Sequence, residues 1–381
     1  GYTTNRGTTY NAYLILADKI TLIDTVKSPF KDELLSRIAS VINPVDIDYI
    51  ISNHAEMDHS GALPAIIEAV KPEKVFASAN GVKALREHFH FDYELVAVQD
   101  GDTLDIGNLT LKFLETRMLH WPDSMVTYLV EDELLFSQDG FGMHLAHSKR
   151  FADETELDLM LYEAKKYYAN ILLPYSGLVA KLLERIKGLS IKTIAPDHGP
   201  IWRKEPETIV RWYRQWAEQQ PGRKLVIAYD TMWHSTALMA QAIADGAMES
   251  GVDTKVMPLR ASDRSAIMTE ILDAGAVAIG SPTINNGLFP TIADLLTYMK
   301  GLKPRNKVGA TFGSYGWSGE ASSIIAQELH GMGWELVGEP LRVKFVPDDA
   351  AKQKCRDLGR LIATRVSEKC NDAGKASASG D

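Results

Sequence analysis

The run His54-Ala55-Glu56-Met57-Asp58-His59 places four side chains that can bind a metal ion within six residues. It comes shortly after the apolar run 47–51, which is typical of a buried β-strand. A strand that ends in such a cluster predicts one half of a binuclear metal site. Two of the four side chains are carboxylates, and carboxylates favour hard metal ions such as iron over zinc.

Further potential ligands follow other apolar runs in the sequence. His120 comes after 111–114, Asp139 after 134–136, and His198 after Ile194 and Ala195. Side chains at strand ends on separate loops can converge on one rim of a sheet. One buried histidine is usually a core group, and one Asp before Gly is usually part of a turn. The joint pattern favours a metal centre made of His54, Glu56, Asp58, His59, His120, Asp139 and His198.

Composition excludes several classes of function. The chain has 41 Lys and Arg against 50 Asp and Glu, a net charge of −9, so we expect neither nucleic acid nor an anionic membrane as a partner. Its two cysteines, Cys355 and Cys370, form no C-x-x-C pair for an iron–sulfur cluster or a rubredoxin-type iron. No apolar run approaches the roughly 20 residues of a membrane span, and the sequence shows no signal-peptide pattern. We therefore expect a cytoplasmic protein whose iron is bound by histidine and carboxylate.

The chain divides near 219–223, where an amphipathic helix gives way to a new strand. Residues 1–222 combine short strands with helical segments and predict a mixed α/β domain with antiparallel strand pairs. Residues 223–370 alternate apolar strands with helix-period stretches, which predicts a doubly wound parallel sheet. Residues 371–381 are small and polar and predict a disordered tail.

Three loops in the second part of the chain are suited to bind the phosphate and the ring of a flavin. Hydroxyls and backbone N–H groups between a strand and the following helix make a phosphate cradle, aided by the helix N-terminus. Two later loops supply glycines for close approach, amides for the flavin edge and aromatic rings for stacking. A G-x-G-x-x-G fingerprint is missing, so NAD is not expected as a tight cofactor. The predicted flavin residues are Thr231, Met232, Trp233, His234, Ser235, Thr236, Ser281, Pro282, Thr283, Asn285, Asn286, Gly287, Ser314, Tyr315, Gly316, Trp317, Ser318 and Gly319.

Together these motifs resemble the flavodiiron proteins, also called A-type flavoproteins. The similarity covers essentially the whole chain and includes the stretches 54–61, 116–124 and 196–199 besides the flavin loops. It implies a metallo-β-lactamase-like αββα domain followed by a flavodoxin-like domain, with FMN and two iron ions as cofactors. By resemblance, one iron is bound by His54, Glu56 and His120, the second by Asp58, His59 and His198, and Asp139 bridges them.

The resemblance also implies an activity and partners. The expected enzyme is an oxidoreductase in which FMN feeds electrons to a diiron centre that reduces O2 to water, NO to N2O, or both. A head-to-tail homodimer is the expected active unit, and rubredoxin, another small electron-donor protein or reduced coenzyme F420 is the expected electron donor.

Two alternatives remain open at this point. One is a zinc hydrolase of the metallo-β-lactamase fold with an accessory flavodoxin domain, although such hydrolases usually carry His where Glu56 stands. The other is an electron carrier whose first domain is structural, which leaves the seven ligands unexplained. His144 and His147 match no ligand position and are expected at the surface. The side chains Tyr167, Tyr168, Asp123 and Asp197 are candidates to orient ligands or supply protons.

Overall fold

The computed structural model describes residues 2–90 and 92–378. Contacts divide the chain into two compact units. The first unit comprises Thr4–Tyr167 and Tyr175–Arg214, and the second comprises residues 2–3, Tyr168–Pro174 and the described chain from Gln215 onward. The domain boundary between residues 222 and 223 stays a prediction. No described helix is long and apolar enough to cross a membrane.

The first unit contains two five-stranded sheets. In one sheet the first two strands are antiparallel and the others parallel, in the order β1 (Tyr13–Ile15), β2 (Thr21–Ile23), β3 (Tyr49–Ser52), β4 (Lys74–Ser78) and β5 (Leu95–Val98). In the other sheet only the first pair is parallel, and the order is β10 (Thr193–Pro196), β9 (Leu134–Gln138), β8 (Met125–Leu129), β7 (Thr110–Glu115) and β6 (Thr103–Asp105).

The first sheet carries apolar side chains on both faces, and each face contributes to a separate hydrophobic core. Leu22, Ile50 and Val75 pack on one face with the apolar sides of α1 (Lys31–Ala39), α3 (Leu63–Val70) and α4 (Ala79–Phe89). Ile51 and Phe76 point to the other face, where they meet Phe113 and Phe136 of the second sheet. Successive residues of a strand point to opposite faces, so these apolar runs require cover on both sides. The unit also contains α2 (Met57–Ser60), α5 (Leu157–Tyr167) and α6 (Ser176–Ile186), and α7 (Glu207–Glu218) spans the division between the units.

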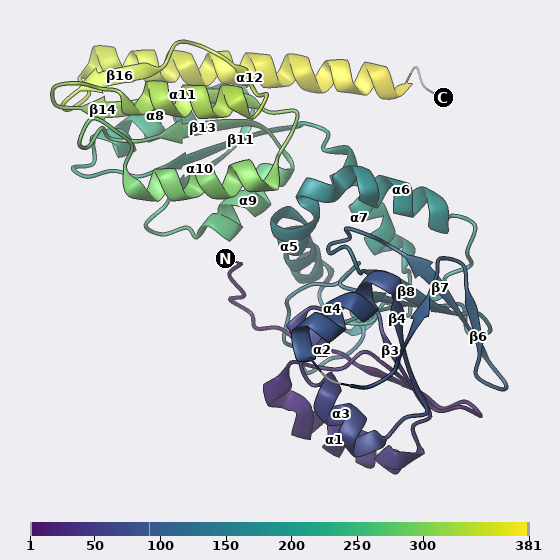
Figure 1. The fold of residues 1–381 in the computed structure, drawn as a ribbon. Helices are drawn as coiled ribbons and strands as arrows, with labels where there is room; N and C mark the ends of the chain where they lie inside the picture. Colours follow the sequence, from purple (N-terminus) through teal and green to yellow (C-terminus); the bar gives the residue numbers. More distant parts are fainter. Residues whose placement is uncertain (1, 91, 379–381) are drawn as a thin grey trace. The chain divides into compact units, whose positions relative to one another are not determined.

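The second unit is built on a parallel sheet. Its strand order is β12 (Asp253–Pro258), β11 (Gly222–Tyr229), β13 (Ala274–Gly280), β14 (Val308–Tyr315) and β15 (Glu335–Leu336), and β16 (Leu341–Lys344) also pairs with β14. Figure 1 shows α8 (Ser235–Glu249) and α12 (Asp349–Ala378) on one face and α9 (Arg264–Leu272) and α10 (Pro290–Leu302) on the other. The remaining helix is α11 (Ala321–Gly331). Chain order reverses between β11 and β13, and such a switch point is where doubly wound sheets bind ligands.

Two local features differ from the sequence-based prediction. Asp58 and His59 belong to the short helix α2 rather than to a loop at a strand end. The predicted tail 371–381 also differs, since α12 continues through Ala378, and the last three residues lie outside the described part of the chain.

Candidate functional site

The seven predicted metal ligands come from one edge of the first unit. His54 and Glu56 follow β3, and α2 carries the next two ligands. Asp139 directly follows β9, and His198 follows the neighbouring strand β10. Because β9 and β10 are parallel, their carboxyl ends reach the same edge, and the residues after them lie together. His120 comes from the turn between β7 and β8.

These side chains form two clusters in which the potential ligand atoms lie within 4.8 Å of one another. The first cluster contains His54, Glu56, His120 and Asp139. The second contains Asp58, His59 and His198. All seven residues singled out in the sequence therefore meet in the structure.

Asp139 joins the two clusters, because its two carboxylate oxygens face different sides. Oδ2 lies 3.2 Å from Nε2 of His120 and 3.5 Å from Nε2 of His54. Oδ1 lies 3.2 Å from Nε2 of His59 and 3.2 Å from Nε2 of His198. A carboxylate in this position can give one oxygen to each of two metal ions.

Two of the histidines have a hydrogen-bond acceptor on Nδ1. The His54 Nδ1 lies 3.1 Å from Asp123 Oδ2. The His59 Nδ1 lies 3.3 Å from Asp197 Oδ2, but the two atoms make no hydrogen bond. The His198 Nδ1 donates to the backbone carbonyl of Thr9 over 2.6 Å. An acceptor on Nδ1 keeps the proton there and leaves Nε2 free to bind a metal ion. Asp123 is thus placed to orient His54, which is one of the roles considered for it from the sequence, and the role of Asp197 stays a prediction.

The charges of the clusters complement one another in the absence of metal. Burial lowers the pKa of His120, but hydrogen bonds with Asp139 and Glu56 outweigh burial and raise it to about 9. Burial raises the pKa of Glu56, but hydrogen bonds with His120 and His54 outweigh burial and lower it to about 2. Burial also raises the pKa of Asp139, yet the nearby His59 and hydrogen bonds from His120 and His198 hold it well below its usual range. Carboxylates kept anionic in a buried place are suited to bind cations.

The donor set fits a pair of iron ions. Within the described residues, the buried oxygen Asp58 Oδ1 makes no hydrogen bond, so it is left with a lone pair for another partner. Histidine nitrogens and carboxylate oxygens are the ligand types found in non-haem iron sites. Three carboxylates carry −3, and one bridging hydroxide would bring the ligand charge to −4, which balances two divalent ions.

The side chains of His144 and Tyr167 lie beside the cluster that contains His59 and His198. The His144 ring lies 4.6 Å from that of His198 and 5.1 Å from that of Tyr167, centroid to centroid. Thr8 Oγ1 lies 2.7 Å from His144 Nδ1. The expected surface role is therefore wrong for His144, whereas His147 is exposed as expected. Spacing in the sequence gave no sign of this contact, because His144 lies in a loop whose path depends on the whole domain.

The predicted flavin residues lie in or next to three neighbouring loops of the second unit, with Ser314 and Tyr315 at the end of β14 and Ser235 and Thr236 at the start of α8. The loops follow β11, β13 and β14, which are adjacent in the sheet. Thr236 Oγ1 is 2.9 Å from Ser314 Oγ, and the Thr283 N–H donates to the Ser314 carbonyl over 3.0 Å. Asn286 Nδ2 donates to Glu320 Oε1 over 3.3 Å. These bonds tie the three loops to one another around the β11/β13 switch point.

The same loops fit FMN. The Thr231 hydroxyl is buried and has no hydrogen-bond partner among the described residues, which suits a donor to a phosphate beside the α8 N-terminus. Trp233 and Trp317 are each 83% exposed, a costly state for an indole that ring stacking would relieve. A Cβ at Gly313 would lie 2.0 Å from the Ser281 carbonyl oxygen, so the two loops approach more closely than any side chain allows.

Comparisons with known proteins agree with both halves of the chain. Residues 8–199 match the family described as ODP family beta lactamase, and residues 227–359 match the flavodoxin family. A nitric oxide reductase of Moorella thermoacetica is 47% identical, over 96% of this chain and 93% of that protein. A rubredoxin-oxygen oxidoreductase of Megalodesulfovibrio gigas is 46% identical, over 97% of this chain and 93% of that protein. The crystal structure of the flavodiiron protein from Giardia intestinalis superposes with a TM-score of 0.95 at 35% identity, covering 98% of this chain and 92% of that one.

Fold and site together define an oxidoreductase that joins a β-lactamase-like metal domain to a flavodoxin domain. The chain belongs to the flavodiiron protein family. Its cofactors are FMN and a diiron centre, and the sequence-based predictions of family, fold class and enzyme class are confirmed. The zinc-hydrolase alternative is disfavoured.

Proposed function

We propose that this protein reduces O2 to water, NO to N2O, or both, at a diiron centre supplied with electrons through FMN. The observation that carries the proposal is the position of Asp139, whose two oxygens face the two ligand clusters. The names of the relatives support the substrates, since one is a nitric oxide reductase and another a rubredoxin-oxygen oxidoreductase.

In this proposal each cluster holds one iron ion. His54, Glu56 and His120 bind the first, and Asp58, His59 and His198 bind the second, with Asp139 between them. Bound iron would supply the redox-active metal that binds and activates a diatomic molecule, and FMN would supply stored electrons.

The exposed ligands indicate where a small substrate enters. Glu56 is 36% exposed at its side chain, and Asp58 and His120 are also partly exposed, whereas His54, His59 and His198 are buried. Met57, between the two exposed carboxylates, is itself exposed. Entry past this rim lets a diatomic molecule reach the centre while the buried histidines keep their positions.

The decisive test is the variant Asp139→Ala. Without the bridge, we expect iron content to fall well below two per chain and turnover of O2 and NO to be lost, while FMN remains bound. The matched control is His147→Ala, which removes an exposed histidine outside both clusters and should keep iron, FMN and turnover. Wild-type iron content and turnover in Asp139→Ala would contradict the bridging role, and zinc in place of iron in the active wild-type protein would contradict the proposed chemistry.

Substrate preference is tested on the wild-type protein. Anaerobic stopped-flow mixing of the fully reduced, iron-quantified protein with O2 and separately with NO should reoxidise the flavin with at least one of them. Inertness toward both would refute the proposed function even if two iron ions were bound.

The proposed electron donor is a small protein of the rubredoxin type, with reduced coenzyme F420 as the alternative. The name of the Megalodesulfovibrio gigas relative supports the first. We further propose a head-to-tail homodimer in the cytoplasm. Failure of reduced rubredoxin to reduce the FMN would contradict the proposed donor. Light scattering that shows a monomer in a fully active sample would contradict the proposed homodimer.

A further inference from the structure

A pocket of about 590 Å³ lies in the first unit, and the proposed reaction does not use it. Its volume falls within the range of about 300–1,000 Å³ that small-molecule sites occupy. The floor is apolar and includes Leu14, Leu34 and Ile38 from β1 and α1. Polar and charged side chains stand around it, which gives the pocket an amphipathic lining.

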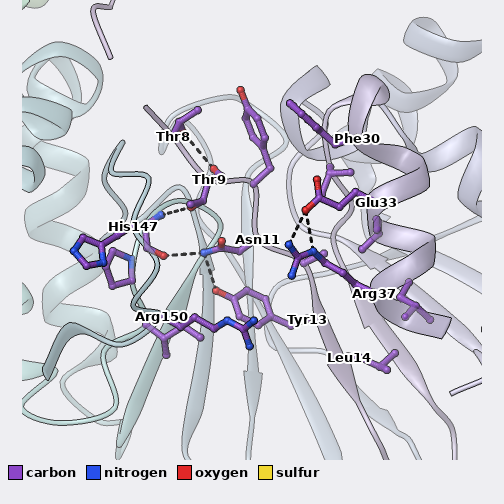
Figure 2. Close-up of a pocket in the computed structure, with 18 of the residues that line it drawn as sticks. Thr8, Thr9, Asn11, Tyr13, Leu14, Phe30, Glu33, Arg37, His147 and Arg150 are labelled. Atoms are coloured by element: carbon purple, nitrogen blue, oxygen red, sulfur yellow. Dashed lines mark hydrogen bonds and ion pairs between the residues drawn. The ribbon is translucent and has the colours of Figure 1, made fainter. Parts of the chain in front are cut away.

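The charged lining is mainly positive. Arg37, Lys149 and Arg150 line the pocket, together with His147 and a single carboxylate, Glu33. Figure 2 shows Arg37 and Arg150 reaching from opposite walls toward the middle of the pocket. Glu33 neutralises Arg37 through two hydrogen bonds to its guanidinium, of 3.0 and 2.6 Å. In the described part of the chain, no hydrogen bond or ion pair engages the side chains of Lys149 and Arg150.

We propose that this pocket binds an organic anion with an apolar body, of the kind represented by a medium-chain carboxylate. The apolar floor takes the hydrocarbon part, and the anionic group pairs with Arg150, whose charge no described side chain neutralises, on the side of the pocket opposite the Glu33-paired Arg37. A neutral or cationic ligand with the same body lacks the second of these interactions. This site goes beyond the proposed reaction and does not depend on it.

The pocket shares a wall with the metal centre. Thr8, Thr9 and Tyr10 line it. On the other side of the same segment, the Thr9 carbonyl accepts from His198, and the Tyr10 ring lies 5.7 Å from the His198 ring, centroid to centroid. Tyr10 also stacks at 5.6 Å on Phe30, another lining residue. A ligand that packs against this wall restrains the group that orients His198, so its binding is coupled to iron retention.

Isothermal titration calorimetry of the protein loaded with iron and FMN tests the site, with decanoate as the probe. We expect saturable binding of one decanoate per chain. Decyltrimethylammonium, with the same chain length and opposite charge, should bind at least tenfold more weakly, and butyrate, with less apolar surface, about a hundredfold more weakly. Absence of saturable decanoate binding, or equal binding of the cation, would overturn the proposal.

Arg150→Gln locates the site, because it removes an exposed charge without disturbing any described side-chain bond. Decanoate should bind this variant about tenfold more weakly, as expected for loss of a charge-assisted hydrogen bond. The matched control is Arg86→Gln on α4, an exposed arginine of the same unit that does not line the pocket. Unchanged affinity in Arg150→Gln, or an equal loss in both variants, would overturn the assignment to this pocket.

The coupling has its own readout, the rate at which a chelator removes iron. Saturating decanoate should slow iron release about fivefold in the wild-type protein, and the same concentration should have little effect on Arg150→Gln. Equal release rates with and without bound decanoate would overturn the coupling, and the binding measurement would still decide the site.

Discussion

His120 gives the metal centre a proton that must leave when iron binds. In the metal-free protein, hydrogen bonds with Asp139 and Glu56 overcome burial and raise the pKa of His120 from 6.5 to about 9. A difference of this size corresponds to about 3 kcal/mol of free energy between the two protonation states. At pH 7.5 the metal-free site therefore carries a cation on the nitrogen that a metal ion needs.

The sign of the pH dependence follows from the raised pKa. A histidine with a higher pKa in the folded state than in the unfolded chain stabilises the fold when it is protonated. For His120 this contribution is fully present below about pH 6.5 and is lost as the pH rises through about 9. Iron affinity runs in the opposite direction and should increase over the same range, because fewer protons compete for the ligand.

Histidine labelled with ¹³C at Cε1 allows the pKa to be measured directly by NMR on the metal-free protein. The His120 signal is identified by its absence in His120→Gln, and its apparent pKa should lie near 9. Urea unfolding should show that the wild-type unit loses about 3 kcal/mol more than His120→Gln between pH 6.5 and 9.5. An apparent pKa at or below 6.5 would refute the inferred partnership with the two carboxylates.

Four further substitutions test the second unit. Thr231→Val should weaken FMN binding about tenfold, measured by flavin fluorescence, and leave the stability of the FMN-free protein unchanged or higher, because the buried hydroxyl has no partner among the described residues. Trp317→Ala should weaken FMN binding by a similar factor with no change in the unfolding midpoint of the FMN-free protein, since the side chain is 83% exposed; a lower midpoint would indicate a structural role. Gly280→Ala should lower the free energy of unfolding by about 1–3 kcal/mol in chemical unfolding, because the new Cβ would lie 2.3 Å from the Phe312 ring. Gly301→Ala in α10 should raise the free energy of unfolding by about 0.5–1 kcal/mol, because the new Cβ would have no atom within 4 Å and alanine favours a helix.

The convergence of the seven side chains could be predicted from the sequence because most of them follow strands. The apolar runs fix the strands to within a few residues: the run 47–51 corresponds to β3, which is Tyr49–Ser52, and the run 134–136 corresponds to β9, which is Leu134–Gln138. Parallel neighbours then bring the residues that follow them to one edge, as β9 and β10 do for Asp139 and His198. Periodicity and strand ends are local properties, so they can be read from the chain alone.

Other parts of the site depend on contacts that carry no sequence signal. The acceptor that orients His198 is the backbone carbonyl of Thr9, and any residue there offers the same group. His144 reaches the His198 ring through a loop, where no period constrains the direction of a side chain. The basic pocket combines residues of α1 with the segment around Arg150, far apart in the chain, so neither stretch shows it by itself.

The surroundings of the centre bear on why this version of the β-lactamase fold suits redox chemistry. Behind His59, burial raises the pKa of Asp24 to about 6 and holds the pKa of Asp197 well above its usual range. Near neutral pH the two acids therefore retain a proton more readily than an exposed pair would. A buried acid holds its proton less tightly when positive charge nearby increases. Loss of a proton from Asp24 or Asp197 would therefore limit the change in buried charge if a metal ion at the seven ligands were oxidised. A hydrolytic zinc ion keeps a constant charge, so compensation of this kind matters to a centre whose metal charge varies. The carboxylates at Glu56 and Asp139 and the acids behind the histidines thus favour the same chemistry.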